Sequence, residues 1–148
     1  MLTPPTVAVI GGGQLARMMQ ESAIALGINL RALVEADDGS TGQVTVDKAA
    51  GAPSDLDAVR ALIDGADVLT FEHEHIPAQT MEEAARVVSV QPPAPALLYA
   101  QDKLQMRARL SEMVIPCPAW ARVDNAAELE RFGAVIGWPL IVKTPGGG

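Results

Sequence analysis

The sequence predicts an α/β protein built on a parallel, Rossmann-like sheet, and three observations lead to that fold class. Short apolar runs rich in β-branched residues alternate with amphipathic stretches of helical length. The first such run, residues 6–10, leads through three glycines into a helical pattern. Hydrophobic residues make up 49% of the chain, which is enough for a packed core. Strands that alternate with helices in this way form βαβ units and a parallel sheet.

The elements of the first 90 residues follow from hydrophobic periodicity and from helix start and stop signals. Strands are expected at 6–10, 29–35, 66–72 and 87–90, with at most one short strand within 44–53. The first helix begins at Gln14, has Leu15, Met18, Ser22 and Leu26 at helical spacing, and ends at Gly27. A second helix is capped by Asp55 and ends at Ile63, and a third has Pro77 in its first turn and ends near Val87.

Three prolines in QPPAPA, residues 91–96, interrupt this alternation and predict the end of the first domain. The predicted organisation is a first domain over 1–92, linker helices over 93–114 and an incomplete second domain over 115–148. Asp102 is expected to cap one helix and Asp124 another, which runs to about Ile136, with a strand at 138–144. Roughly 50 residues after the prolines are too few for a domain of common size, so we expect the chain to be a fragment.

Charge and composition exclude several classes of protein. The net charge of −7 and an aromatic content of 3% argue against nucleic-acid binding, which needs a basic surface. There is no signal-peptide pattern and no apolar run of membrane-spanning length, so we expect a soluble, cytoplasmic protein. Cys117, the single cysteine, lies between two prolines and is expected to be a buried structural thiol.

The glycine turn after the first strand is the first candidate site. Gly11, Gly13 and Ala16 fit the dinucleotide fingerprint, in which glycines admit a phosphate to the free N–H groups of a helix start. Glu35 ends the second strand near where a ribose-binding carboxylate would lie. A dinucleotide, another phosphate-bearing ligand and a tight turn without a ligand all remain open on this pattern.

The stretch TFEHEHIP, residues 70–77, is the second candidate. At strand period Glu72 and Glu74 point one way, and His73 and His75 the other. Carboxylates at the carboxyl end of a parallel strand lie where ligands bind in α/β sheets, and they accept hydrogen bonds from ribose hydroxyls or an amine. Two histidines are a weak metal signal because closed sites need three or four ligands, and a solvated strand end is the other alternative.

Two lysines suggest a phosphate-binding region later in the chain. Lys103 follows Asp102 and lies one helical turn from Arg107, whereas Lys143 ends an apolar run and precedes PGGG. A cation and glycine N–H donors at this spacing suit a triphosphate. Solvent-exposed lysines without a ligand are the alternative.

Four motifs together resemble the N5-carboxyaminoimidazole ribonucleotide synthase family of ATP-grasp ligases. They are GGGQLARM at 11–18, TFEHEHI at 70–76, QDKLQMR with IPCPAW at 101–120, and IVKTPGGG at 141–148. The resemblance implies a preATP-grasp domain over 1–92 followed by the start of an ATP-grasp domain. Val114 departs from the family pattern, in which many members have glycine, and this affects the geometry of that turn.

The resemblance also implies an activity. ATP phosphorylates bicarbonate, with Mg²⁺ bridging the phosphates, and 5-aminoimidazole ribonucleotide takes up the carboxyl group in purine biosynthesis. The residues implied for the ribonucleotide are Gly11, Gly12, Gly13, Gln14, Leu15, Glu72 and Glu74, and those implied for ATP are Lys103, Lys143, Gly147 and Gly148. On this interpretation the turn binds a phosphate and the substrate rather than a dinucleotide.

The resemblance further implies a homodimer, with catalytic residues and Mg²⁺ ligands beyond residue 148, so the chain alone should be inactive. Three alternatives stay open: the related formate-dependent glycinamide ribonucleotide transformylase, an NAD-binding domain, and a non-catalytic binding module.

Overall fold

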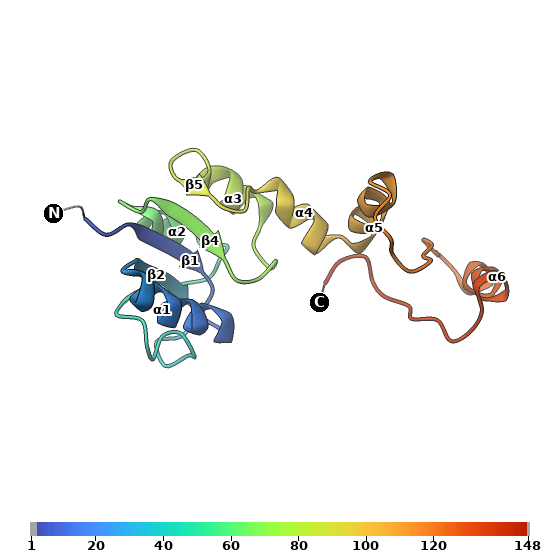
Figure 1. The fold of residues 1–148 in the computed structure, drawn as a ribbon, viewed down its shortest axis with the longest axis horizontal. Helices are drawn as coiled ribbons and strands as arrows, with labels where there is room; N and C mark the ends of the chain where they lie inside the picture. Colours follow the sequence, from blue (N-terminus) through green and yellow to red (C-terminus); the bar gives the residue numbers. More distant parts are fainter. Residues whose placement is uncertain (1–2, 148) are drawn as a thin grey trace. The chain divides into compact units, whose positions relative to one another are not determined.

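Five parallel strands form one sheet in the first part of the chain (Figure 1). This chain is described by a computed structural model that covers residues 3–147. The strands are β1 Thr6–Ile10, β2 Asn29–Val34, β3 Asp47–Ala50, β4 Val68–Phe71 and β5 Ser89–Val90, in the order β3-β2-β1-β4-β5. The predicted α/β class and parallel Rossmann-like sheet are confirmed.

The chain divides into two compact units after Leu97. The first unit holds the sheet with α1 Gln14–Leu26, α2 Leu56–Ile63 and α3 Ala78–Ala84, and α4 Pro95–Gln101 crosses the division. The second unit holds α5 Lys103–Glu112 and α6 Ala126–Ile136. The predicted boundaries at residues 92 and 114 stay predictions.

Helix signals in the first unit act as expected. Asp55 caps α2 by accepting hydrogen bonds from the N–H groups of Asp57 and Ala58 at 3.0 and 3.1 Å. Gly27, with φ of 67°, ends α1 in the left-handed conformation that glycine adopts readily.

The core lies on both faces of the sheet, as the two-residue period of a strand requires. Ala8 and Ile10 of β1 join the larger cluster, which includes side chains of α2 and α3, whereas Val9 joins the cluster beneath α1. The larger cluster consists of Ala8, Ile10, Leu33, Val59, Leu62, Ile63, Leu69, Ile76, Met81, Ala84, Val90 and Leu97.

The large apolar residues of α1 lie mostly on its exposed side. Leu15, Met18 and Leu26 are 58%, 54% and 71% exposed, and the helix instead packs through Ala16 and Ala23. Small side chains at these two positions allow the helix to approach the sheet closely. The predicted helix is confirmed, and the side that packs on the sheet is the one with Ala16 and Ala23.

Strand β4 and helix α3 are also shorter than predicted. Strand β4 ends at Phe71, so the alternation expected through residue 75 does not hold. Pro77 occupies the N-cap position of α3 rather than its first turn, and α3 ends at Ala84, before turns that lead to β5.

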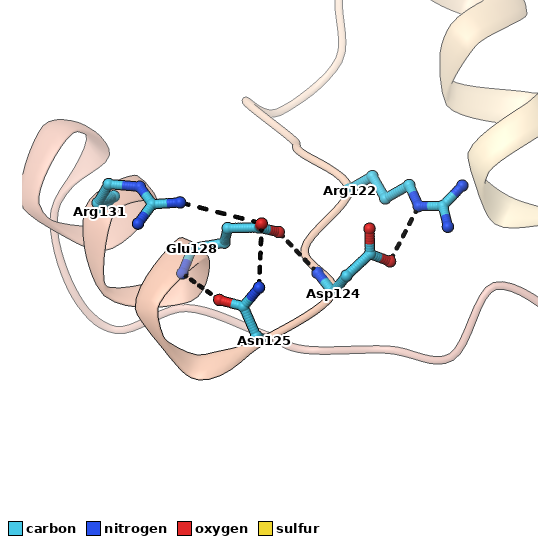
Figure 2. A network of polar contacts seen from close by, with 5 residues as sticks. All are labelled: Arg122, Asp124, Asn125, Glu128 and Arg131. Carbon is cyan, nitrogen blue, oxygen red and sulfur yellow. Dashed lines mark hydrogen bonds and ion pairs between the residues drawn. The ribbon is translucent and has the colours of Figure 1, made fainter.

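A polar network begins α6 (Figure 2). Asn125 Oδ1 accepts a hydrogen bond from the Glu128 N–H at 3.0 Å, and Glu128 Oε2 accepts one from the Asp124 N–H at 2.9 Å. This reciprocal arrangement satisfies donors that a helix start leaves free. The cap is therefore Asn125 rather than the predicted Asp124, whose carboxylate instead pairs with Arg122 at 3.0 Å.

The predicted strand at 138–144 is wrong. The segment is irregular and pairs with no strand in residues 3–147. The Trp138 ring lies against Gly133 of α6, where an added Cβ would collide with the indole. Pro139 cannot donate a ladder hydrogen bond, and an apolar run without a partner edge does not form a sheet.

The end of α5 places a valine in a glycine conformation. Val114 has φ of 57°, and the N–H groups of Val114 and Ile115 donate to the carbonyls of Ser111 and Leu110 at 3.0 and 2.9 Å. This is the Schellman pattern, in which glycine normally takes the left-handed position. Cys117, further along, is half-buried, so the prediction of a buried thiol was wrong.

Candidate functional site

The glycine turn lies at the carboxyl edge of the sheet. Strand register places Ile10 beside Leu33 and Phe71, so the residues that follow β1, β2 and β4 meet at this edge. Gly11 has φ of 146°, and its N–H donates to the Leu33 carbonyl at 3.1 Å. Gly13 precedes α1 in an extended conformation, so the free N–H groups of the helix start face this edge.

The Glu72 carboxylate caps the N-terminus of α1. Its Oε1 accepts a hydrogen bond from the Gly13 N–H and its Oε2 one from the Ala16 N–H, both at 2.6 Å. The first turn of α1 contains no acidic residue, so the anion that complements the helix dipole comes from the end of β4. The structure thus brings Glu72 to the glycine turn, where the resemblance places both among the substrate residues.

The loop over residues 36–45 closes the turn from another side. Thr41 donates from its N–H to the Gly12 carbonyl at 3.1 Å and from its hydroxyl to the Gly13 carbonyl at 2.7 Å. Ser40 Oγ donates to Gln14 Oε1 at 3.0 Å, so part of the Gln14 amide is engaged within the protein. Arg17 likewise donates to the Ser40 carbonyl at 2.8 Å. Leu15, in the same helical turn as Gln14 and Arg17, is exposed.

The remaining residues of the acidic motif follow Glu72 in an irregular stretch. Glu74 is half-buried and lies 3.8 Å from His75, measured from Oε1 to Nε2. His73 Nδ1 accepts a hydrogen bond from the His75 N–H at 3.2 Å. Within residues 3–147 no three histidine, cysteine or carboxylate side chains gather as metal ligands. The two-histidine metal alternative therefore gains no third ligand from the described part of the chain.

Two segments of the predicted phosphate-binding region, the start of α5 and residues 145–147, lie together in the second unit. The Lys103 N–H donates to the Pro145 carbonyl at 2.8 Å, and Lys103 Nζ donates to the Gly147 carbonyl. Asp102 holds the start of α5 by accepting from the N–H groups of Leu104 and Gln105 at 2.8 and 3.0 Å. The helix start, its lysine and the glycine loop therefore adjoin one another.

The other two residues expected at the ATP phosphates are Lys143 and Gly148. Lys143 is exposed in the irregular segment before the loop, and Gly148 lies outside the described residues. Separately, no helix in the described part of the chain combines the length and the apolar character needed to cross a bilayer.

Pattern reasoning missed the contribution of the loop over 36–45. Thr41 is fully buried, and it contacts Gly12 and Gly13, which lie 29 and 28 positions earlier in the chain. The sequence ADDGSTG signals a polar turn, but nothing in it indicates which surface the turn will cover.

Comparison with known families identifies the first unit. Residues 5–101 match the model of the ribonucleotide synthetase preATP-grasp domain. N5-carboxyaminoimidazole ribonucleotide synthase of Mycobacterium bovis is 46% identical over 145 residues, which are 97% of this chain and 34% of that protein. The enzyme of the same name from Pseudomonas aeruginosa is 35% identical over 93% of this chain and 38% of its own length.

Solved structures give the same result. The N5-carboxyaminoimidazole synthetase of Staphylococcus aureus, complexed with ADP, superposes with a TM-score of 0.88 at 27% identity over all of this chain and 40% of its own. The synthase of Aspergillus clavatus, in complex with ADP and 5-aminoimidazole ribonucleotide, gives 0.82 at 34% identity over 94% of this chain and 38% of its own. The chain thus spans little more than a third of these relatives.

Proposed function

The chain belongs to the ribonucleotide synthetase preATP-grasp family, and from this premise we propose that it is part of an N5-carboxyaminoimidazole ribonucleotide synthase. The observation that carries the proposal is the 46% identity to the mycobacterial synthase over 97% of the chain. That alignment continues past residue 101, where the preATP-grasp match ends, and so includes most of the second unit. A dinucleotide-binding domain would not need that second unit.

The proposed reaction is an ATP-dependent carboxylation in purine biosynthesis. Bicarbonate attacks the γ-phosphorus of ATP, ADP leaves, and carboxyphosphate forms. The exocyclic amine of 5-aminoimidazole ribonucleotide then attacks the carboxyl carbon, directly or after carbon dioxide is released. Phosphate departs, the amine loses a proton, and the N5-carboxylated ribonucleotide is the product.

We assign the ribonucleotide to the carboxyl edge of the sheet. The residues proposed are Gly11, Gly12, Gly13, Gln14, Leu15, Glu72 and Glu74. Support comes from the meeting of the β1 and β4 ends at this edge, which is where ligands bind in α/β sheets. Each Glu72 oxygen accepts one N–H and keeps a lone pair that an amine or a ribose hydroxyl can use.

We assign the ATP phosphates to Lys103, Lys143, Gly147 and Gly148. Support comes from the contact between Lys103 Nζ and the Gly147 carbonyl, which sets a cation against a glycine loop. Ammonium groups and backbone donors are the groups that offset charge as a phosphoryl group is transferred. Lys103 would exchange the carbonyl for a phosphate oxygen when the nucleotide binds.

A Mg²⁺ ion bound with ATP would need oxygen ligands, and the described residues offer no cluster of three carboxylate, histidine or cysteine side chains. We therefore propose that its ligands, and the remaining catalytic residues, belong to the rest of a longer protein. Bound Mg²⁺ would neutralise phosphate charge during transfer. A cytoplasmic homodimer that uses bicarbonate completes the proposal.

The test is ADP release by the full-length reading frame that contains this chain. ATP and Mg²⁺ are supplied with aminoimidazole ribonucleotide or glycinamide ribonucleotide, with and without bicarbonate or formate. Stimulation by the aminoimidazole compound together with bicarbonate is the expected result, and the isolated 148 residues should give no turnover. Stimulation only by the glycinamide compound with formate would reassign the chain to the transformylase, and no turnover would favour a binding module.

A further inference from the structure

The glycine turn has the sequence and position of a phosphate-binding turn, yet its donors already have an anion. In a turn that binds a dinucleotide, the pyrophosphate accepts N–H groups at the helix start. In this protein the Gly13 and Ala16 N–H groups donate to the two oxygens of Glu72 at 2.6 Å each. Bonds to a carboxylate are stronger than bonds to neutral acceptors, so a competing anion has to replace a well-held charge.

The glycines of the turn fit the Glu72 side chain. A Cβ atom at Gly11 would overlap Glu72, and one at Gly13 would lie 2.9 Å from Glu72 Oε1. Gly12 is needed for a different neighbour, because its Cβ would lie 3.1 Å from the Cα of Val34. Each glycine in the motif thus has a reason within the protein itself, without a bound phosphate.

The carbonyl side of the turn is engaged as well. Thr41 binds the Gly12 and Gly13 carbonyls, and this contact comes from a loop that is separate in sequence from Glu72. Glu35, which would hold the ribose in a dinucleotide domain, is exposed beside the turn. Thr41 therefore binds the carbonyl groups of the turn, and Glu72 binds its N–H groups at the position that a phosphate would otherwise occupy.

We propose that Glu72 is a specificity-determining residue whose carboxylate occupies the phosphate position of the turn and so excludes phosphate groups, including those of dinucleotides. A ligand that approaches this edge must present hydrogen-bond donors to Glu72 instead of a second anion. The proposal does not depend on the reaction that the longer protein performs.

The experiment follows the Gly13 and Ala16 amide signals in ¹⁵N–¹H spectra of the 148-residue chain during titration with inorganic phosphate and, separately, with NAD⁺. Wild type should show no saturable shift at these amides with either probe. Glu72→Ala frees both N–H groups and should show saturable shifts at both amides, at phosphate concentrations at least about tenfold below the highest one at which wild type shows none. Glu35→Ala removes the same charge beside the turn without touching these donors, and it should behave as wild type does.

Glu72→Gln keeps the shape of the side chain and guards against a folding failure of Glu72→Ala. Its single carbonyl oxygen replaces only one of the two carboxylate oxygens that Gly13 and Ala16 use, so one N–H group loses its acceptor and phosphate should bind, but more weakly than to Glu72→Ala. Saturable shifts of Gly13 and Ala16 in wild type would overturn the proposal. The absence of phosphate binding in folded Glu72→Ala or Glu72→Gln, or equal gains in Glu35→Ala, would overturn it too.

Discussion

The two units of the chain treat similar apolar residues in opposite ways. In the first unit the strands bury valines, leucines and isoleucines almost completely, for example Ile10 and Leu69, which are both 0% exposed. In the second unit Val114, Val135 and Ile141 are 86%, 82% and 85% exposed. Apolar composition alone therefore does not make a core.

The difference follows from the sheet. Parallel strands present two apolar faces, and α1 on one face with α2 and α3 on the other cover them. The described part of the second unit has helices and irregular segments only, and its order rests on caps and turns such as those of Asp102 and Asn125. A cap contributes about 1 kcal/mol, whereas a buried leucine contributes about 3 kcal/mol, so the first unit should be the more stable.

The largest effect should come from removing a buried side chain in the first unit. Leu69→Ala leaves a cavity in the larger core cluster and should lower the free energy of unfolding by about 3 kcal/mol. Ile141→Ala, its match in the second unit, should change it by less than about 0.5 kcal/mol. Urea unfolding followed by circular dichroism measures both, with Trp120 and Trp138 fluorescence reporting on the second unit. Equal losses in the two variants would contradict the comparison.

Removing a helix cap should have a smaller effect on stability, and its extent should differ between the two units. Asp55→Ala and Asn125→Ala each remove an N-cap, at a cost of about 1 kcal/mol. For Asp55 the loss should appear in the unfolding of the whole first unit, because α2 is part of its core. For Asn125 it should appear only as faster amide exchange in α6. Hydrogen exchange measured residue by residue distinguishes the two, and a loss of protection in the sheet of Asn125→Ala would be the contrary result.

The smallest effect on stability should come from changing the left-handed residue that ends α1 or α5. Gly27 after α1 and Val114 after α5 both take the left-handed position, at φ of 67° and 57°. Val114→Gly should stabilise the end of α5 by about 0.5 to 1 kcal/mol, because the strain of a branched residue exceeds the added freedom of the unfolded chain. The reverse type of change, Gly27→Ala, should destabilise α1 by a similar amount. Slower amide exchange at Ile115 is the expected signal, and faster exchange there would reject this account.

Local signals predicted much of the first unit. The apolar run at 6–10, the glycine stop at Gly27 and the Asp55 cap each act within a few residues, so the sequence alone was enough to place β1, α1 and α2. Motif spacing also identified the family, and the departure at Val114 was correctly tied to turn geometry.

The remaining features depend on residues far apart in the chain. The side of α1 that packs is set by the space left above the sheet, which favours Ala16 and Ala23 over the larger Leu15. The run at 138–144 is apolar enough for a strand, but strand formation requires a partner edge. The target of Glu72 lies 59 residues away along the chain, so no local pattern reveals it. The assignments of substrate and ATP residues stay predictions.

The separation between Glu72 and the helix it caps has a consequence for the order in which the chain folds. The ribosome adds Gly13 and all of α1 to the chain well before residue 72. The first turn of this helix has no acidic residue of its own. A helix of 13 residues is marginal in water without packing or a cap. We therefore expect the first turn of α1 to become fully ordered only after β4 has joined β1.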